Sequence, residues 1–190
     1  MQDDSLTKLS VRDFLERLAA PTPVPGGGSA AALAGALAAG LGHMAATLTL
    51  GKPRFADVAE RVRSLAERLG KAGQMLRQLI DEDAAAYGEL SSALKVDKSD
   101  PQRRAKIQQA ATLAAEVPLQ TATLAQRVLA DLGALKAGVN PSLQSDVEAA
   151  SHLARAAVHA AAANVRVNLP LMDPQAAAEV GRQLESLPKE

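Results

Sequence analysis

Long alanine-rich segments with apolar residues at helical spacing dominate this sequence. Alanine fills 41 of the 190 positions, and it is the strongest helix former while being depleted in strands. One run of apolar residues follows the three-to-four-residue period of a helix face: Val58, Val62, Leu65, Leu69, Met75, Leu76, Leu79 and Ile80. No segment reads as a strand. The pattern predicts an all-α fold whose core consists of alanine and leucine at close helix–helix contacts.

Prolines, glycines and capping residues divide this pattern into about six mostly antiparallel helices, which we expect to form a single domain over residues 1–190. The expected helices cover residues 10–20, 30–50, 54–94, 101–137, 145–168 and 173–187. Their expected N-terminal caps are Ser10, Ser29, Asp100, Ser145 and Asp173, because short polar side chains can accept the free N–H groups of a first turn.

The two longest helices are expected to be kinked. A helix of forty residues would be about 60 Å long, so the third is expected to bend near Gly70 or Gly73. Pro118 is expected to kink the fourth, because proline lacks the N–H that a helix interior needs. The Gly51-Lys52-Pro53 segment is expected to end the second helix.

The composition argues against several classes of function. Lysine plus arginine balance aspartate plus glutamate, 21 against 21, so no basic excess attracts nucleic acid, and three aromatic residues supply few stacking surfaces for bases. The absence of cysteine excludes disulfides and thiolate metal sites. That absence suits a reducing compartment, and the acidic start Met1-Gln2-Asp3-Asp4 is unlike a signal peptide. We therefore expect a cytoplasmic protein.

The apolar run over residues 30–50 raises the question of a membrane span. Its residues are mostly alanine and glycine, which are weakly hydrophobic, and it contains His43. A buried core helix is the better interpretation, so we expect no membrane partner.

The sequence Gly26-Gly27-Gly28-Ser29 opens the second expected helix. Free N–H groups and the helix dipole at such a start can hold an anion. The alternative is a flexible entry to a packed helix. A phosphate loop is excluded, because no Gly-Lys-Ser/Thr follows and no strand precedes.

Three successive acidic residues, Asp81, Glu82 and Asp83, lie within the third expected helix. Acidic clusters on helices are usually solvated, and that interpretation stays open. Asp83, however, lies four positions after Leu79 and four before Tyr87, so it shares a face with apolar residues. A carboxyl group in such a place is partly desolvated, which raises its pKa toward the range that suits proton transfer.

Two further groups of polar residues are candidates for binding. Asn164 and Asn168 are spaced i, i+4 on one helix face, and buried amides must find partners, of which a ligand is one. Asn140, Ser145 and Asp146 could bond to a heterocyclic ring or could simply form a turn and a helix cap.

Basic residues that could meet an acidic substrate, or could merely be solvated, are Lys52, Arg103, Arg104, Lys106 and Arg166. The three histidines are scattered. His152 and His159 are two turns apart without an evident third ligand, so we expect no metal site.

Several stretches, in order along residues 9–173, together resemble the formiminotetrahydrofolate cyclodeaminase/methenyltetrahydrofolate cyclohydrolase family. They are Pro25-Gly26-Gly27-Gly28-Ser29-Ala30-Ala31-Ala32 with Leu50-Gly51-Lys52, Asp81-Glu82-Asp83-Ala84-Ala85-Ala86-Tyr87, Glu116-Val117-Pro118-Leu119, Asn140 with Ser145-Asp146, and Asn164-Val165-Arg166-Val167-Asn168-Leu169. One departure is visible: the family usually has glycine directly before the asparagine, where this chain has Val139.

The resemblance implies an all-helical homodimer that acts on a tetrahydrofolate derivative, with a polyglutamate tail, and without metal or a tightly bound cofactor. It implies that Asp83 is the catalytic acid/base. The substrate-binding residues implied are Gly26, Gly27, Gly28, Ser29, Lys52, Tyr87, Asn140, Ser145, Asp146, Asn164 and Asn168.

Two activities of one site fit this resemblance. A cyclodeaminase would form 5,10-methenyltetrahydrofolate and ammonia from formiminotetrahydrofolate, and we place it first. A cyclohydrolase would open the methenyl bridge to 10-formyltetrahydrofolate, and the lack of a formiminotransferase segment in this sequence favours that alternative. A non-catalytic helical dimer and a folate-binding module are the alternatives outside enzymes.

Overall fold

Six α-helices and four short 3-10 helices make up the computed structural model, which describes residues 5–50 and 52–187. The α-helices are α1 (Val11–Ala19), α2 (Gly27–Leu50), α3 (Ala59–Leu94), α4 (Arg103–Lys136), α5 (Gln144–Asn168) and α6 (Pro174–Glu185). The 3-10 helices are η1 (Leu6–Lys8), η2 (Pro53–Val58), η3 (Pro141–Leu143) and η4 (Leu169–Leu171). The predicted all-α fold is therefore confirmed. The predictions made for Met1–Asp4 and for Gly51 lie outside the described residues.

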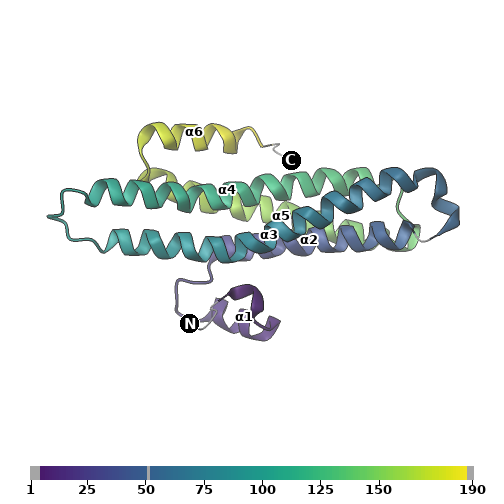
Figure 1. Ribbon diagram of the computed structural model, residues 1–190, viewed down its shortest axis with the longest axis horizontal. Helices are drawn as coiled ribbons and strands as arrows, with labels where there is room; N and C mark the ends of the chain where they lie inside the picture. The colour runs from purple at the N-terminus through teal and green to yellow at the C-terminus, as the bar shows by residue number, and fades with distance from the viewer. Residues whose placement is uncertain (1–4, 51, 188–190) are drawn as a thin grey trace.

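The four long helices α2, α3, α4 and α5 lie lengthwise against one another as a bundle (Figure 1). Helix α1, with η1, projects from one side of this bundle, and α6 packs along the opposite side (Figure 1). In the same view α3 changes direction along its length, while α4 continues unbroken through Pro118. We call residues 5–20, which contain η1 and α1, the N-terminal arm.

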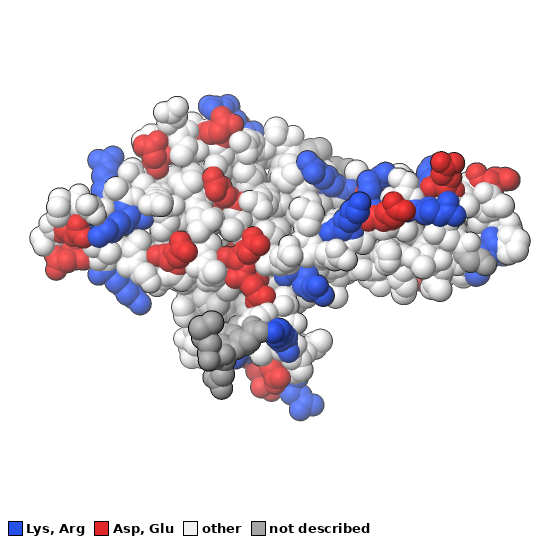
Figure 2. Space-filling model, in the orientation of Figure 1, with Lys and Arg blue, Asp and Glu red and all other residues white. Residues whose placement is uncertain are grey.

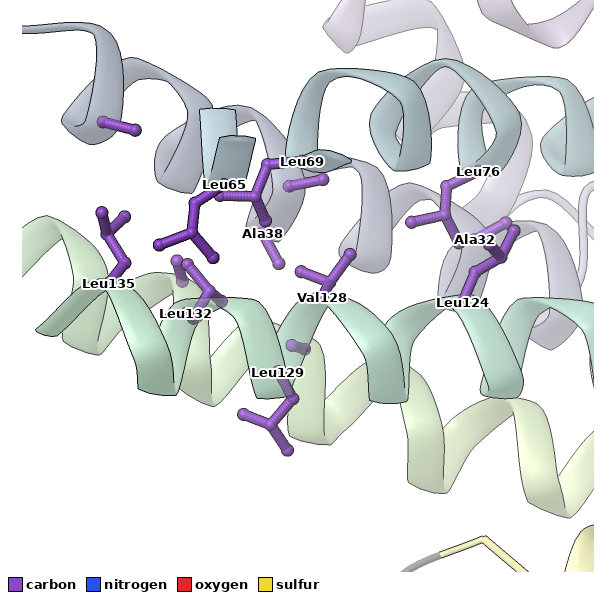
Figure 3. Close-up of a cluster of buried hydrophobic side chains, with 14 of the residues drawn as sticks. Ala32, Ala38, Leu65, Leu69, Leu76, Leu124, Val128, Leu129, Leu132 and Leu135 are labelled. Carbon is purple, nitrogen blue, oxygen red and sulfur yellow. The ribbon is translucent and has the colours of Figure 1, made fainter. Parts of the chain in front are cut away.

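Alanine and leucine form the main core, as expected (Figure 3). Leu65 and Leu69 of α3 and Leu132 of α4 are at most 1% exposed, and they point into the space between α2, α3 and α4. Gly42 of α2 permits this approach, because a Cβ atom there would lie 2.5 Å from Leu132 Cδ2. A larger residue at position 42 would force the helices apart.

Two of the predicted caps are confirmed by their hydrogen bonds. The Ser10 Oγ atom accepts the Asp13 N–H at 3.1 Å, and Asp173 Oδ1 accepts the N–H groups of Gln175 and Ala176. Each is followed by the expected helix, because its side chain satisfies donors that the first turn leaves free.

The other three caps were predicted wrongly. Helix α2 begins at Gly27, so Ser29 lies inside its first turn and is fully buried. Helix α5 begins at Gln144, so Ser145 lies inside its first turn and does not cap it. Asp100 closes a turn through Gln102 N–H before α4 begins at Arg103. Packing and a preceding turn, rather than local capping, set these three starts.

Helix α2 is the one described helix whose length and composition would suit a membrane span. In this structure α3, α4 and α5 all pack against it. Ala32, Ala38 and Ala45 on it are 0% exposed, an arrangement expected of a core helix.

Candidate functional site

The side chain of Asp83 on α3 meets the first turn of α2. Its Oδ2 atom lies 2.9 Å from the Ser29 hydroxyl oxygen, and that oxygen lies 3.0 Å from the carbonyl oxygen of Ile80. Gly28 makes room for the carboxyl group, since a Cβ atom on Gly28 would lie only 1.9 Å from Asp83 Oδ1. The predicted carboxyl group and the predicted glycine turn are thus in direct contact.

Gly27 makes the same kind of room on another side of the helix start. A Cβ atom there would lie 3.0 Å from Asn164 Nδ2 and 3.3 Å from Asn164 Oδ1. The Asn164 amide donates from Nδ2 to the carbonyl oxygen of Ala160 at 2.9 Å. No donor among the described residues bonds to its Oδ1 atom, so that oxygen can accept from a ligand. Asp83 and Asn164 therefore flank the first turn of α2.

Burial changes the chemistry of the carboxyl group at this position. Desolvation raises the pKa of Asp83, and the hydroxyl and backbone N–H of Ser29 limit that rise when they donate to the carboxylate. A half-buried carboxyl group with a raised pKa can both give and take a proton near neutral pH more readily than a solvated one. The structure thus agrees with the desolvation predicted for Asp83.

Asn168 has a structural bond that the sequence pattern did not reveal. Its Nδ2 atom donates to the carbonyl oxygen of Ala114 on α4 at 2.8 Å and to the carbonyl oxygen of Asn164 at 3.0 Å. Ala114 lies four residues before Pro118, so its carbonyl lacks the helical N–H that it would otherwise accept. The Asn168 amide supplies the missing donor and ties α5 to α4.

Asp81, on the same helix as Asp83, holds the N-terminal arm. Its carboxylate accepts the hydroxyl of Ser5 at 2.8 Å, the N–H of Leu6 at 2.6 Å and the hydroxyl of Thr7 at 3.1 Å. Sequence analysis singled out the acidic cluster but gave Asp81 no such role. The one available signal was its place two residues before Asp83, because a contact 75 residues away leaves no local pattern.

Other predicted residues near this end of the bundle are more exposed. Tyr87 is 42% exposed on α3, and Arg166 is exposed on α5. Arg103 donates to the carbonyl oxygens of Val96 and Leu94, and Lys106 pairs with Asp100 at 2.8 Å. These last two basic residues therefore stabilise the turn between α3 and α4. Arg104 is exposed, and Gly26 is partly buried directly before α2.

A second group of predicted residues lies at the opposite end of the bundle. The Asn140 N–H donates to Thr49 Oγ1 at 3.0 Å, near the last residue of α2. Gly28 and Thr49 are 21 helical residues apart, which corresponds to about 30 Å. Lys52 follows the end of α2, and Ser145 and Asp146 begin α5 at this same end. One chain therefore does not bring these four residues to Asp83.

The contacts of Asn140 are those of a structural residue. It is 1% exposed, and its Oδ1 atom accepts from Arg54 Nη2 at 2.7 Å and from Ser142 N–H at 3.4 Å. The odds between a turn-forming role and a binding role were even from sequence. Burial and saturated hydrogen bonding favour the turn.

The histidines are as scattered in space as in sequence. His43 Nδ1 lies 2.9 Å from the carbonyl oxygen of Ala66, His152 lies 4.0 Å from Glu148, and His159 is exposed. Over residues 5–50 and 52–187, no three histidine, aspartate or glutamate side chains gather as metal ligands would. Independence from metal stays a prediction.

The fold and the site together define an all-α protein in which a half-buried carboxyl group meets a glycine-opened helix start. The chain belongs to the formiminotransferase-cyclodeaminase family, whose sequence profile matches residues 10–186. Relatives in this family carry the names of enzymes that act on folate one-carbon units, which agrees with the resemblance seen in the sequence motifs.

Two relatives illustrate the range of these names. A methenyltetrahydrofolate cyclohydrolase of Methylorubrum extorquens is 34% identical over 94% of this chain and 88% of its own length. A formimidoyltransferase-cyclodeaminase of Rattus norvegicus is 32% identical over 88% of this chain. The chain spans only 32% of that longer relative.

A solved structure supports the same membership. The formiminotetrahydrofolate cyclodeaminase of Thermotoga maritima superposes with a TM-score of 0.87 at 27% sequence identity. The match covers 95% of this chain and 88% of the other, so the whole bundle is shared.

Proposed function

We propose that this chain is a formiminotetrahydrofolate cyclodeaminase, which forms 5,10-methenyltetrahydrofolate and releases ammonia. The contact of the half-buried Asp83 carboxyl group with the start of α2 carries this proposal. Membership in a folate one-carbon enzyme family and the likeness to a cyclodeaminase of known structure support it.

The reaction needs two proton transfers at one place. A nitrogen of the folate attacks the formimino carbon, and a tetrahedral intermediate forms. The amine leaves as ammonia once it has gained a proton, and the attacking nitrogen loses its own. One carboxyl group can serve as acid for the first transfer and as base for the second, a contribution of about 10²–10⁴-fold. Asp83 is the group suited to this role.

The surroundings of Asp83 can position the substrate. The free Oδ1 atom of Asn164 can accept an N–H of the pterin ring beside Gly27. The N-terminus of α2 carries a partial positive charge, which suits the negative charge of a folate carboxylate near Gly26. Holding the reacting atoms in place adds to the effect of proton transfer.

Methenyltetrahydrofolate cyclohydrolase activity is the second candidate. It is favoured by the relative of that name, which this chain matches over 88% of the relative's length. Water would add to the methenyl carbon, and the same carboxyl group would take the proton from that water and pass it to the departing ring nitrogen.

A spectrophotometric assay of both substrates tests these proposals. The protein is supplied with formiminotetrahydrofolate and then with methenyltetrahydrofolate, and the methenyl absorbance is followed. We expect one of the two reactions to be catalysed, and Asp83→Asn to lower its kcat about 10²–10⁴-fold. Glu82→Gln is the matched control, because Glu82 is an exposed neighbour on the same helix.

The outcome also separates enzyme from non-enzyme. If neither substrate is consumed by the wild-type protein, the catalytic proposal fails and a folate-binding module or a helical scaffold takes its place. If Asp83→Asn keeps full turnover while circular dichroism shows an unchanged fold, Asp83 is not the catalytic group.

We also propose that two copies associate through the face of α2 beside the N-terminal arm. A groove of about 780 Å³ lies between that arm, α2 and α3, and its lining is mostly apolar. Val11, Leu37 and Leu48 on α1 and α2 are 80%, 52% and 52% exposed. A second copy would cover these side chains, which a single copy leaves in water. Cytoplasmic localisation and a polyglutamate tail on the substrate stay predictions.

A further inference from the structure

We propose that Ser29 is a positioning residue that stabilises the acid form of Asp83 by giving its own hydroxyl proton to the carbonyl oxygen of Ile80. This inference deepens the proposed function and rests on it only for the catalytic use of the acid form. It concerns how the chain prepares the proton that the departing amine needs.

The first step of the argument is a count of protons. The Ser29 oxygen lies 3.0 Å from the Ile80 carbonyl oxygen and 2.9 Å from Asp83 Oδ2. A serine hydroxyl has one proton to donate and two lone pairs to accept. The Ile80 carbonyl can only accept. When the Ser29 proton goes to Ile80, a hydrogen bond to Asp83 requires the carboxyl group to be the donor, and therefore to be protonated.

The second step concerns burial. Ser29 is 0% exposed, so water cannot satisfy its hydroxyl group. With Asp83 protonated, the chain from Asp83 to Ser29 to Ile80 uses every proton once, and no partner is left bare. With Asp83 ionised, the hydroxyl turns to the carboxylate, which is the stronger acceptor, and Ile80 loses it. The acid form is thus the one that satisfies all three groups.

The third step is the ionisable surroundings of Asp83. No ionisable residue occurs on α2 before His43. On α3 the nearest groups are Asp81, whose carboxylate is occupied by residues 5–7, and the exposed Glu82 and Tyr87. Arg17 of the N-terminal arm lines the cleft beside Asp81, and Arg166 of α5 is exposed. No ion pair with Asp83 is found among the described residues, so hydrogen bonding can decide its protonation.

Titration of the Asp83 side chain tests the proposal without any substrate. The protein is labelled with ¹³C at aspartate side-chain carboxyl groups, and the Asp83 signal is identified by its loss in Asp83→Asn. We expect Ser29→Ala to move the titration midpoint to lower pH, because the acid form loses its acceptor. If the hydroxyl instead served mainly the carboxylate, the midpoint would rise. A midpoint that is unchanged or higher overturns the proposal.

Two further variants complete the experiment. Ser151→Ala removes a buried helix serine that donates only to the Val147 carbonyl, at 2.7 Å, and the Asp83 midpoint is expected to stay in place. Ser29→Cys nearly keeps the volume and offers a weaker acceptor, so its midpoint is expected between those of wild type and Ser29→Ala. This second variant decides the question if Ser29→Ala does not fold, since a midpoint above wild type refutes the proposal.

Activity provides a separate reading. In the wild type the turnover that depends on the acid form should decline as pH rises through the Asp83 midpoint, and in Ser29→Ala that decline should begin at lower pH. Turnover unaffected by Asp83→Asn, together with the expected titration shift, would remove the proposed function and leave the proton arrangement standing. The reverse combination would remove only the role of Ser29.

Discussion

Gly27 and Gly28 are adjacent in sequence but admit different partners. The missing Cβ of Gly28 leaves space for the Asp83 carboxyl group, and that of Gly27 leaves space for the Asn164 amide. A methyl group at position 28 would overlap Asp83 at 1.9 Å and at least one of the two groups would have to move. Each glycine therefore serves the site through close approach.

We expect Gly28→Ala to abolish most turnover by displacing Asp83, and to lower stability by about 1–3 kcal/mol, as overpacking usually does. Gly40→Ala is the control in the same helix, because no atom lies within 4 Å of its Cβ position. That change is expected to keep activity and to add up to about 1 kcal/mol of stability through helix propensity. Turnover and chemical unfolding would be measured for both, and an active Gly28→Ala enzyme would contradict this account of the site.

Asp83 should also affect how stability depends on pH. Burial raises the pKa of Asp83, so the folded state holds this proton more tightly than the unfolded state does. Stability contributed by this group therefore falls as pH rises from the ordinary aspartate pKa to the raised one, and the loss persists at higher pH. We expect Asp83→Asn to be more stable than wild type near pH 7.

The advantage of Asp83→Asn should shrink below the ordinary aspartate pKa of about 3.9, where both states of the wild type are protonated. Urea unfolding at several pH values measures this. An advantage that is equal at acid and neutral pH would mean that ionisation of Asp83 is not its source.

At the scale of elements, Pro118 and Asn168 form a pair that joins α4 to α5. Pro118 deprives the Ala114 carbonyl of its helical donor, and Asn168 Nδ2 replaces that donor at 2.8 Å. We expect Asn168→Ala to cost about 1–3 kcal/mol, because it leaves a carbonyl group without a partner. In a Pro118→Ala background the helical N–H returns, so the same change should cost about 1 kcal/mol less.

A double-mutant cycle by chemical unfolding measures this coupling. Strictly additive costs would show that Asn168 does not stand in for the missing donor. The pair also explains why a proline lies inside a continuous 34-residue helix: its lost bond is replaced from a neighbouring helix.

At the scale of the whole molecule, charge and apolar surface are distributed differently. Lysine and arginine are interspersed with aspartate and glutamate on the face shown in Figure 2, so this face presents no large field of one sign. The N-terminal arm stands out from the bundle in the same view. The apolar groove beside the arm is the feature that a second copy could cover.

We expect the protein to sediment as a dimer at micromolar concentration. Leu37→Glu places a charge at an exposed apolar position of α2 and is expected to shift the protein toward a monomer. Glu148→Lys changes charge at an exposed site on α5 and is the control. A wild-type monomer at that concentration would refute the dimer, and a dimer unaffected by Leu37→Glu would refute this interface.

Much of the fold was predictable because its causes are local. Helical spacing of apolar residues and the high alanine content predict the all-α fold, and the caps at Ser10 and Asp173 depend on residues two to three positions away. The wrong starts at Ser29 and Ser145 have the opposite origin. Each serine could cap a helix locally, but the helix begins earlier in the folded chain.

The sequence alone determined that Asp83 would share a helix face with apolar residues, because periodicity fixes which side chains lie together on one helix. Only the tertiary structure decided that Ser29 and Gly28 meet this carboxyl group across 54 or more positions, that Asn168 serves Ala114, and that Asn140 lies at the far end. These contacts depend on how separate helices pack, and packing is set by the shapes of many side chains at once rather than by any local pattern.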